Sequence, residues 1–116
     1  MKKILVVDDE ENIRMLYQEE LAAEGFQTIP ACSGEEAMVL FEQENPDLVT
    51  IDIQLPGMSG IELLRKLRAR DKEKPIIIVT AYGEYKQDFN VWASDAYVTK
   101  SSDITEFVET VKKILS

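Results

Sequence analysis

The sequence predicts an α/β fold, a three-layer α/β/α sandwich in which helices cover both faces of a five-stranded parallel sheet. Three observations lead to this prediction. Five short apolar runs alternate with five segments of helical spacing along the chain. The first and third runs are apolar over nearly their whole length, which is typical of parallel strands buried on both faces. Polar residues follow four of the five runs, at the strand ends where ligands bind in open α/β sheets.

Length and composition describe one domain with a single core. The chain has 116 residues, of which 45% are hydrophobic and 30% charged, and we expect residues 1–116 to form a single domain. No apolar run approaches the roughly 20 residues of a membrane span, and the N-terminus lacks a signal-peptide pattern, so we expect a cytoplasmic protein. The formal charge of −9 argues against direct contact with nucleic acid or an anionic membrane surface.

Two residue counts exclude several classes of chemistry. The chain contains no histidine, which excludes a histidine general base, a catalytic triad and a phosphohistidine on this chain. Cys32 is the only cysteine, so the chain has no disulfide framework and no cysteine-based zinc site. We expect Cys32 to be a small, semi-buried residue.

The first three expected elements are a strand, a helix and a second strand. The first strand covers 3–7, is apolar after its lysine and is expected in the centre of the sheet. A helix follows from about 10 to 24, with acidic residues in its first turn and Gly25 at the C-cap position. The weaker second strand, 26–31, contains Pro30. Because proline cannot donate to a sheet ladder, we place this strand at an edge.

Capping and helix-breaking residues delimit the next three elements. The second helix opens at Ser33 and ends before Pro46. A short run rich in β-branched residues follows at 48–51 and leads to Asp52, and its length and flanking prolines favour a central parallel strand over a helix. Ser59 is the expected N-cap of a third helix that reaches about Arg70.

The last third of the chain contains two strands and two helices. The strands are expected at 76–80 and 96–99. Between them, 81–95 has aromatic residues at helical intervals but also weak helix formers, so we expect a short or irregular fourth helix. The last helix opens at Ser102 or Asp103 and has the clearest apolar stripe in the chain.

Polar residues at four strand ends predict a functional site. Because the carboxyl ends of parallel strands meet at one edge of the sheet, we expect these side chains to lie together. A simpler interpretation of Asp52 alone is that it caps the following turn. The coincidence at four strand ends favours a site: Asp8 and Asp9 follow the first strand, Asp52 the third, Thr80 the fourth and Lys100 the fifth.

The residue types at this edge indicate Mg²⁺ and phosphoryl chemistry. Three neighbouring carboxylates repel one another, and without histidine or cysteine a hard, oxygen-preferring cation such as Mg²⁺ is suited to hold them. With Mg²⁺ beside Asp52, the Thr80 hydroxyl and the Lys100 ammonium would neutralise the oxygens of a phosphoryl group in transfer. This arrangement predicts phosphorylation of Asp52 itself.

At this point the chain resembles a known family. The pair Asp8-Asp9, the segment 52–60 (Asp-x-x-Leu-Pro-Gly-Met-Ser-Gly), Thr80-Ala81, Tyr97 and Lys100 together resemble the receiver domains of response regulators in bacterial two-component signalling. The resemblance covers the whole chain and is of the chemotaxis-regulator type. It implies the flavodoxin-like strand order 2-1-3-4-5, which agrees with an edge position for the strand that contains Pro30.

The resemblance implies a role for each residue of the site. Asp52 would be the phosphoacceptor, Asp9 would bind Mg²⁺ directly and Asp8 mainly through water. The backbone carbonyl of Gln54 would complete the protein ligands, and Lys100 would pair with the phosphoryl group. The phosphodonor would be a sensor histidine kinase or a histidine phosphotransfer protein. The domain would be no enzyme beyond catalysing its own phosphorylation and dephosphorylation.

The resemblance also implies a switch that phosphorylation operates. Thr80 would move toward the attached phosphoryl group, and Tyr97 would turn inward in the active state. The alternative for Tyr97 is an ordinary strand aromatic. Gln54 and Tyr82 occupy positions that influence how fast the aspartyl phosphate hydrolyses. The output would pass to a downstream protein target through the face around the fourth helix, fifth strand and fifth helix, in a monomer or a phosphorylation-dependent homodimer.

Two features depart from the family pattern. Ser101 stands where the family usually has a cis-proline, and a cis bond before a non-proline residue costs roughly 2.5 to 4 kcal/mol, so we favour a trans peptide with a rebuilt loop. The interval from Thr80 to Lys100 is also short, and Ala93-Ser94 replaces the usual Gly-Ala pair. Both changes affect the expected output face.

Three other interpretations remain. An aspartyl-phosphate hydrolase of the haloacid-dehalogenase type would need a second aspartate where Gln54 stands, and a cap for which the chain has no room. A pseudo-receiver would bind partners without being phosphorylated, and Ser101 and the irregular fourth helix keep this alternative open. A flavin-binding protein of the same fold would need amides and hydroxyls where Asp8 and Asp9 stand.

Overall fold

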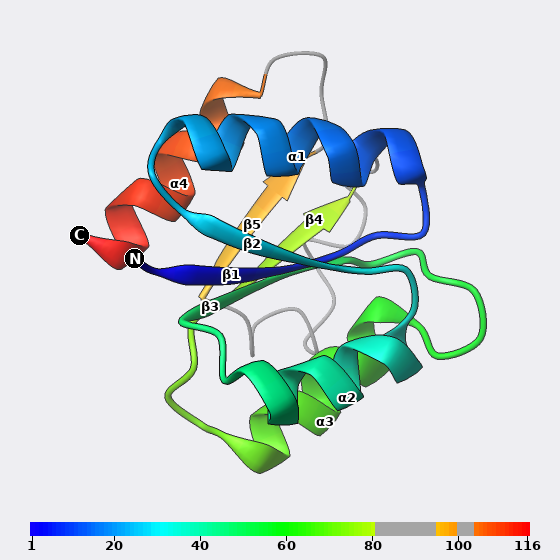
Figure 1. The fold of residues 1–116 in the computed structure, drawn as a ribbon. Helices are drawn as coiled ribbons and strands as arrows, with labels where there is room; N and C mark the ends of the chain where they lie inside the picture. Colours follow the sequence, from blue (N-terminus) through cyan, green and yellow to red (C-terminus); the bar gives the residue numbers. More distant parts are fainter. Residues whose placement is uncertain (81–94, 100–103) are drawn as a thin grey trace.

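Five parallel strands form one sheet in the order β2-β1-β3-β4-β5 (Figure 1). The computed structural model describes residues 1–80, 95–99 and 104–116. The prediction of the order 2-1-3-4-5 is confirmed, as is the edge position of the strand with Pro30. The strands are β1 Lys3–Val7, β2 Gln27–Ala31, β3 Leu48–Asp52, β4 Ile76–Thr80 and β5 Ala96–Thr99.

Helices cover both faces of the sheet, which confirms the three-layer α/β/α arrangement (Figure 1). In the described ranges the helices are α1 Glu11–Ala23, α2 Gly34–Glu44, α3 Gly60–Arg70 and α4 Thr105–Leu115. The label α4 therefore belongs to the last helix of the chain. The expected short or irregular helix at 81–95 lies outside the described residues except for its last position. Within the described ranges, every helix is too short or too polar to span a bilayer.

Alternation along the strands divides the core into two clusters. Because successive strand side chains point to opposite faces, each central strand supplies both clusters. The face covered by α2 and α3 buries Leu5, Val49, Ile51, Ile76 and Ile78 with Phe41, Leu63, Leu64 and Leu67. The face covered by α1 and α4 buries Ile4, Val6, Leu48, Ile77 and Val79 with Tyr17, Leu21, Phe107 and Val111. β3 and β4 are buried at every position, as expected for central parallel strands.

The ends of α2 and the start of α3 follow the predicted caps. The Ser33 and Ser59 hydroxyls accept hydrogen bonds from backbone amides three residues later, at 3.1 Å in both cases. Asn45 ends α2 in the left-handed conformation (φ 45°). The described part of the last helix begins at Thr105, and the predicted opening residues Ser102 and Asp103 lie outside the described residues. The N-cap of this helix, Ile104, makes no side-chain capping bond and packs against the core cluster under α1 and α4.

Cys32 differs from the expectation. The residue directly follows β2, the edge strand, and is exposed, not semi-buried. An edge strand has a neighbour on one side only, so the residue that leaves it has less of the sheet around it. Its backbone amide donates to the Glu36 carboxylate at 2.7 Å, which ties this turn to the first turn of α2.

Arg68, near the end of α3, joins three segments at the edge of the sheet where the strands begin. Its side chain is 18% exposed. Nη1 donates to the carbonyl of Lys74 at 2.5 Å, and Nη2 to the Asp95 carboxylate at 2.6 Å. The same carboxylate accepts from the backbone amide of Ile76 at 2.8 Å. Arg68 therefore connects α3 to the first residue of β4 and to the residue that precedes β5.

Replacing Arg68 with Met should destabilise the fold by about 2 kcal/mol, because charge-assisted bonds of a mostly buried side chain are lost. The double variant with Asp95→Asn should lose about 1 kcal/mol less unfolding free energy than the two single variants lose together. This difference is the coupling energy expected of residues in contact. The measurement is urea unfolding of wild type, both single variants and the double variant.

Arg70→Met is the matched control for Arg68→Met. Arg70 lies on the same helix and pairs with Glu42, but both side chains are about half exposed. Exposed ion pairs contribute about 0 to 1 kcal/mol, so this variant should stay close to wild type. Equal losses for the two arginine variants would contradict the role assigned to Arg68.

Candidate functional site

The polar strand ends meet at one edge of the sheet, as predicted. Val7 pairs with Ile51, so Asp8, the residue after β1, lies beside Asp52, the last residue of β3. Asp52 pairs with Val79, which places Thr80 one residue further along the neighbouring strand. The three polar residues are buried, with exposed fractions of 1% for Asp8, 5% for Asp52 and 0% for Thr80.

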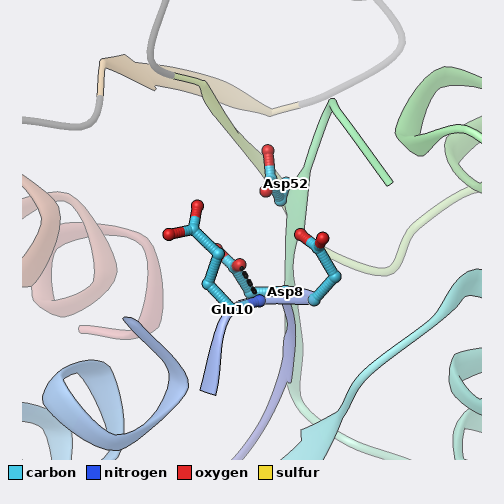
Figure 2. Close-up of side chains that lie close together, drawn as sticks. Asp8, Glu10 and Asp52 are labelled. Atoms are coloured by element: carbon cyan, nitrogen blue, oxygen red, sulfur yellow. Dashed lines mark hydrogen bonds between the residues drawn. The ribbon is translucent and has the colours of Figure 1, made fainter. Parts of the chain in front are cut away.

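Four carboxylates gather at this edge, and we call them the acidic cluster: Asp8, Asp9, Glu10 and Asp52. Figure 2 labels three of them, Asp8, Glu10 and Asp52. One carboxylate oxygen from each residue lies within 4.8 Å of the others. Asp8 and Asp52 are buried, whereas Asp9 and Glu10 are exposed. The cluster therefore has a buried side, formed by the strand ends, and a side that solutes can reach.

Glu10 is the member that sequence reasoning missed. It was assigned to the acidic first turn of the following helix, but α1 begins one residue later. Glu10 is the N-cap with extended backbone (φ −90°, ψ 114°), and its side chain makes no capping bond. Its position directly after Asp8-Asp9 was the available signal, since three successive acidic residues leave a strand end together.

Three hydrogen bonds fix Asp8, and with it the turn from β1 to α1. Its backbone amide donates to the carbonyl of Ala31 at 3.1 Å. Its side-chain Oδ1 accepts from the backbone amide of Glu10 at 2.9 Å, drawn as a dashed line in Figure 2, a local turn typical of aspartate. Its backbone carbonyl accepts from Nη1 of Arg14 at 2.7 Å.

Asp52 is oriented by the loop that follows it. Its Oδ1 accepts from the backbone amide of Gln54 at 3.1 Å, and the amide of Ile53, between these two residues, donates to the carbonyl of Val79 on β4 at 3.0 Å. Gly57 has a positive φ of 70°, as expected in the turn after Pro56. The Gln54 amide thus orients the carboxylate, and the bond from Ile53 to β4 fixes the backbone that carries it.

Gly60 lets α3 start directly against the end of β3. A Cβ atom at this position would lie 2.3 Å from the Asp52 carbonyl oxygen and 2.5 Å from the Ile53 Cα. These neighbours are backbone atoms, which cannot move aside as a side chain can. The Gly60 amide donates to the Ile53 carbonyl at 3.0 Å. The loop that carries Gln54 is therefore closed at both of its ends.

The remaining predicted residues fall in different places. Gln54 is exposed on the loop after Asp52. Tyr97 is half-buried and packs against the core cluster under α2 and α3, two strands away from Asp52. Tyr82, Lys100 and Ser101 lie outside the described residues. The structure thus brings together Asp8, Asp9 and Asp52, with Thr80 alongside.

The geometry of the acidic cluster suits a small divalent cation. Four carboxylates this close repel one another unless a cation neutralises them. Mg²⁺ binds oxygen ligands at about 2.1 Å, so ligands on opposite sides of the ion lie about 4.2 Å apart. The oxygens of the acidic cluster already lie within 4.8 Å. Small side-chain adjustments therefore suffice to bring them to one ion.

A comparison with protein families identifies the family of this chain. The family model described as the response regulator receiver domain matches residues 4–112. The chain belongs to this family. The predicted resemblance is confirmed, and the hydrolase and flavin-binding interpretations lose their support. Receiver domains are the two-component signalling modules that are phosphorylated on an aspartate, and Mg²⁺ is the cofactor that agrees with both the family and the acidic cluster.

Two similar proteins match this chain over nearly the whole length of both partners in the comparison. Sporulation initiation phosphotransferase F of Bacillus subtilis is 40% identical over 116 residues, which is 98% of this chain and 94% of that protein. The response regulator TrrA of Thermotoga maritima, solved with Mg²⁺ and BeF, is 49% identical with a TM-score of 0.95, covering 98% of this chain and 99% of TrrA. Three other curated relatives are longer, and the chain spans 25%, 52% and 48% of them.

A second solved structure shows TrrA with a partner. In the complex with the histidine kinase ThkA, the TrrA chain has a TM-score of 0.93 and 50% identity to this receiver domain, and each chain is covered over 100% of its length. A chain of this fold and length is therefore a partner of a histidine kinase in one solved complex.

Replacing Gly60 with Ala should cost roughly 2 to 3 kcal/mol, because the new methyl group overlaps backbone atoms of Asp52 and Ile53. This loss is expected even though alanine favours a helix over glycine by about 1 kcal/mol. Urea unfolding measures the change, with the slope of the transition as the check on two-state behaviour.

Gly34→Ala is the matched control for Gly60→Ala. A Cβ at Gly34 would approach the side chain of Met58, with Sδ at 2.9 Å and Cβ at 3.0 Å. The sulfur can turn away because methionine is flexible, and the Met58 Cβ needs to give by only a few tenths of an ångström. This substitution should cost less than about 1 kcal/mol. If Gly34→Ala were as damaging as Gly60→Ala, the rigid contact at β3 would not be the cause.

Proposed function

We propose that this receiver domain is a phosphorylation-dependent signalling switch with Asp52 as its phosphoacceptor. The observation that carries the proposal is the position of Asp52, buried at the end of β3 within 4.8 Å of the carboxylate oxygens of three other acidic residues. A carboxylate in such a place is a nucleophile that a bound cation can present to a phosphoryl group. We further propose that residues 1–116 act as one domain.

The proposed reaction is an in-line phosphoryl transfer to the side chain of Asp52. A carboxylate oxygen attacks phosphorus, the bond from phosphorus to the donor nitrogen or oxygen breaks, and the donor leaves with its electron pair. The Gln54 amide donates to Oδ1 at 3.1 Å, which holds the carboxylate at the strand end where a donor can approach it. By family resemblance, the Thr80 hydroxyl and the Lys100 ammonium neutralise charge on the transferred group.

Mg²⁺ would supply charge neutralisation and hold the phosphoryl oxygens in position when bound. We propose Asp9 and Asp52 as direct ligands, Asp8 as a ligand mainly through water, and the backbone carbonyl of Gln54 as the last protein ligand. The exposure of Asp9 supports direct binding from the solvent side, and the burial of Asp8 supports a role behind it. Glu10 adds a fourth carboxylate on the exposed side.

The proposed switch couples the acidic cluster to β4 and β5. Thr80 ends β4 beside Asp52, and Tyr97 packs half-buried on β5. We propose that Thr80 moves toward the phosphoryl group and that Tyr97 turns further inward. Because a phosphoryl group shifts an equilibrium only through its differential contacts, the two states must differ by a few kcal/mol at most. Gln54 and Tyr82 are the proposed positions that set the lifetime of the aspartyl phosphate.

A histidine kinase or a histidine phosphotransfer protein is the proposed phosphodonor. The complex of TrrA with the kinase ThkA and the similarity to a sporulation phosphotransferase support this choice. We propose a protein as the downstream target. It would be reached through the face around the helix expected at 81–95, strand β5 and helix α4. The receiver would act as a monomer or as a phosphorylation-dependent homodimer, and it would catalyse no reaction beyond its own phosphorylation and dephosphorylation.

Incubation with acetyl phosphate and Mg²⁺ should add one phosphoryl group to the wild-type protein and none to Asp52→Asn, because an amide cannot act as the nucleophile. Intact-mass spectrometry measures the adduct directly. The matched control is Asp71→Asn, a conservative change in the turn after α3, which should be phosphorylated as wild type is. An adduct on Asp52→Asn at the wild-type rate would contradict the assignment. No adduct on any variant would instead support the pseudo-receiver interpretation.

Mg²⁺ should raise the thermal midpoint of the wild-type protein by roughly 3 to 6 °C at ten times its dissociation constant, because it binds the folded state. Asp9→Asn should lose most of this shift, since it removes a direct ligand. Glu73→Gln, an exposed carboxylate change near the other edge of the sheet, is the control and should keep the shift. The same Mg²⁺ response in wild type and Asp9→Asn would place the ion elsewhere.

A further inference from the structure

Arg14 reaches from α1 back to the acidic cluster. It lies one turn into the helix, is half-buried, and donates from Nη1 to the backbone carbonyl of Asp8 at 2.7 Å. That carbonyl belongs to the peptide bond between Asp8 and Asp9. A side chain from the helix therefore holds the peptide plane from which two carboxylates of the cluster project.

We infer that Arg14 is a positioning residue for the acidic cluster. By fixing the peptide between Asp8 and Asp9, it keeps the turn from β1 to α1 in the conformation that presents its carboxylates to Asp52. The inference rests on the proposed Mg²⁺-dependent phosphorylation and adds to it a residue that does not itself touch the cation.

The need for such a residue follows from charge. Asp8, Asp9 and Glu10 are consecutive, and their carboxylates converge on a fourth, so repulsion favours any turn conformation that spreads them apart. The strand ladder ends at Asp8, which makes its last bond to Ala31, and the Asp8 side chain restrains Glu10. Among the described residues, the contacts that restrain Asp9 are made by its neighbours in the chain. The bond from Arg14 is a side-chain contact that fixes the peptide before it.

A direct effect of the Arg14 charge would have the opposite sign. A guanidinium near a cation site repels the cation, so loss of the charge alone would strengthen Mg²⁺ binding. Loss of positioning would weaken it, because ligands that are not held in place must be ordered when the ion binds. The sign of the change in Mg²⁺ affinity therefore separates the two explanations.

The experiment compares Arg14→Met, Arg14→Gln and Arg14→Lys with wild type. Met removes the charge and the donors, Gln keeps donors without the charge, and Lys keeps the charge with all its donors on one nitrogen. We expect Arg14→Met to raise the dissociation constant of Mg²⁺ about tenfold, the lower end of what outer-shell contacts contribute. Gln and Lys should fall between Met and wild type. Mg²⁺ titrations followed by calorimetry, with Mg²⁺ alone as the ligand, give the constants.

The rate of phosphorylation at two Mg²⁺ concentrations provides a second readout. A residue that only stabilised the fold would not make this rate depend on Mg²⁺ in the way described below. With acetyl phosphate, Arg14→Met should be slow at limiting Mg²⁺ and should recover to within about twofold of wild type when Mg²⁺ saturates the site, because Asp52 keeps its own contacts. Arg70→Met makes the same charge change on α3 and should match wild type at both Mg²⁺ concentrations. Circular dichroism before titration establishes that each variant is folded.

Unchanged or tighter Mg²⁺ binding by Arg14→Met would overturn the inference. If that variant did not fold, Arg14→Gln would decide in its place. Tighter Mg²⁺ binding by Arg14→Gln would indicate an effect of charge alone, and weaker Mg²⁺ binding would indicate a loss of positioning. Absence of Mg²⁺ binding in wild type would be a failure of the proposed function and would remove the basis of this inference with it. Weaker binding in the Arg14 variants with normal binding in Arg70→Met would support it.

Discussion

Repulsion among the four carboxylates is the constraint on which the rest of the site depends. Each of the residues at the ends of β1 and β3 would be more stable with its charge further from the others, yet their oxygens lie within 4.8 Å of one another. The surrounding structure must therefore supply the restraint. It does so through backbone contacts: the β1 ladder and Arg14 hold Asp8, and the Gln54 amide holds Asp52.

The two edges of the sheet are built differently for this reason. At the edge where strands begin, the Arg68 side chain and the Asp95 carboxylate pair with each other and with backbone groups, so charges there are matched within the protein. At the edge where strands end, the described charges in the cluster have one sign. The first edge therefore needs no added ion to pair these two charges, whereas the acidic cluster at the second edge is suited to be completed by a cation.

Much of the fold and the buried half of the site could be predicted from the sequence, because they follow local rules. Pro30 at an edge, the serine caps and Asp52 at a strand end each rest on a few neighbouring residues. Glu10 was missed because its neighbours also fit the first turn of a helix. The helix begins one residue later than predicted, and this difference places Glu10 in the cluster and not in the helix. Arg14 and Gly60 could not be assigned from the sequence, since their partners are backbone atoms whose positions exist only in the fold.

Charge also explains why the proposed switch must extend beyond the residues that bind the cation. The acidic cluster already carries four carboxylates, and a phosphoryl group on Asp52 makes its total charge more negative. A single Mg²⁺ offsets only part of that total charge. The compensation has to come from the neighbouring strand ends, where Thr80 stands one residue beyond the partner of Asp52 and where Lys100 follows β5. In the proposed switch, drawing those groups toward the phosphoryl oxygens would shift the ends of β4 and β5, and Tyr97 lies on β5. The site and a distant face would then be coupled through these two strands, because the groups that neutralise the new charge belong to their ends.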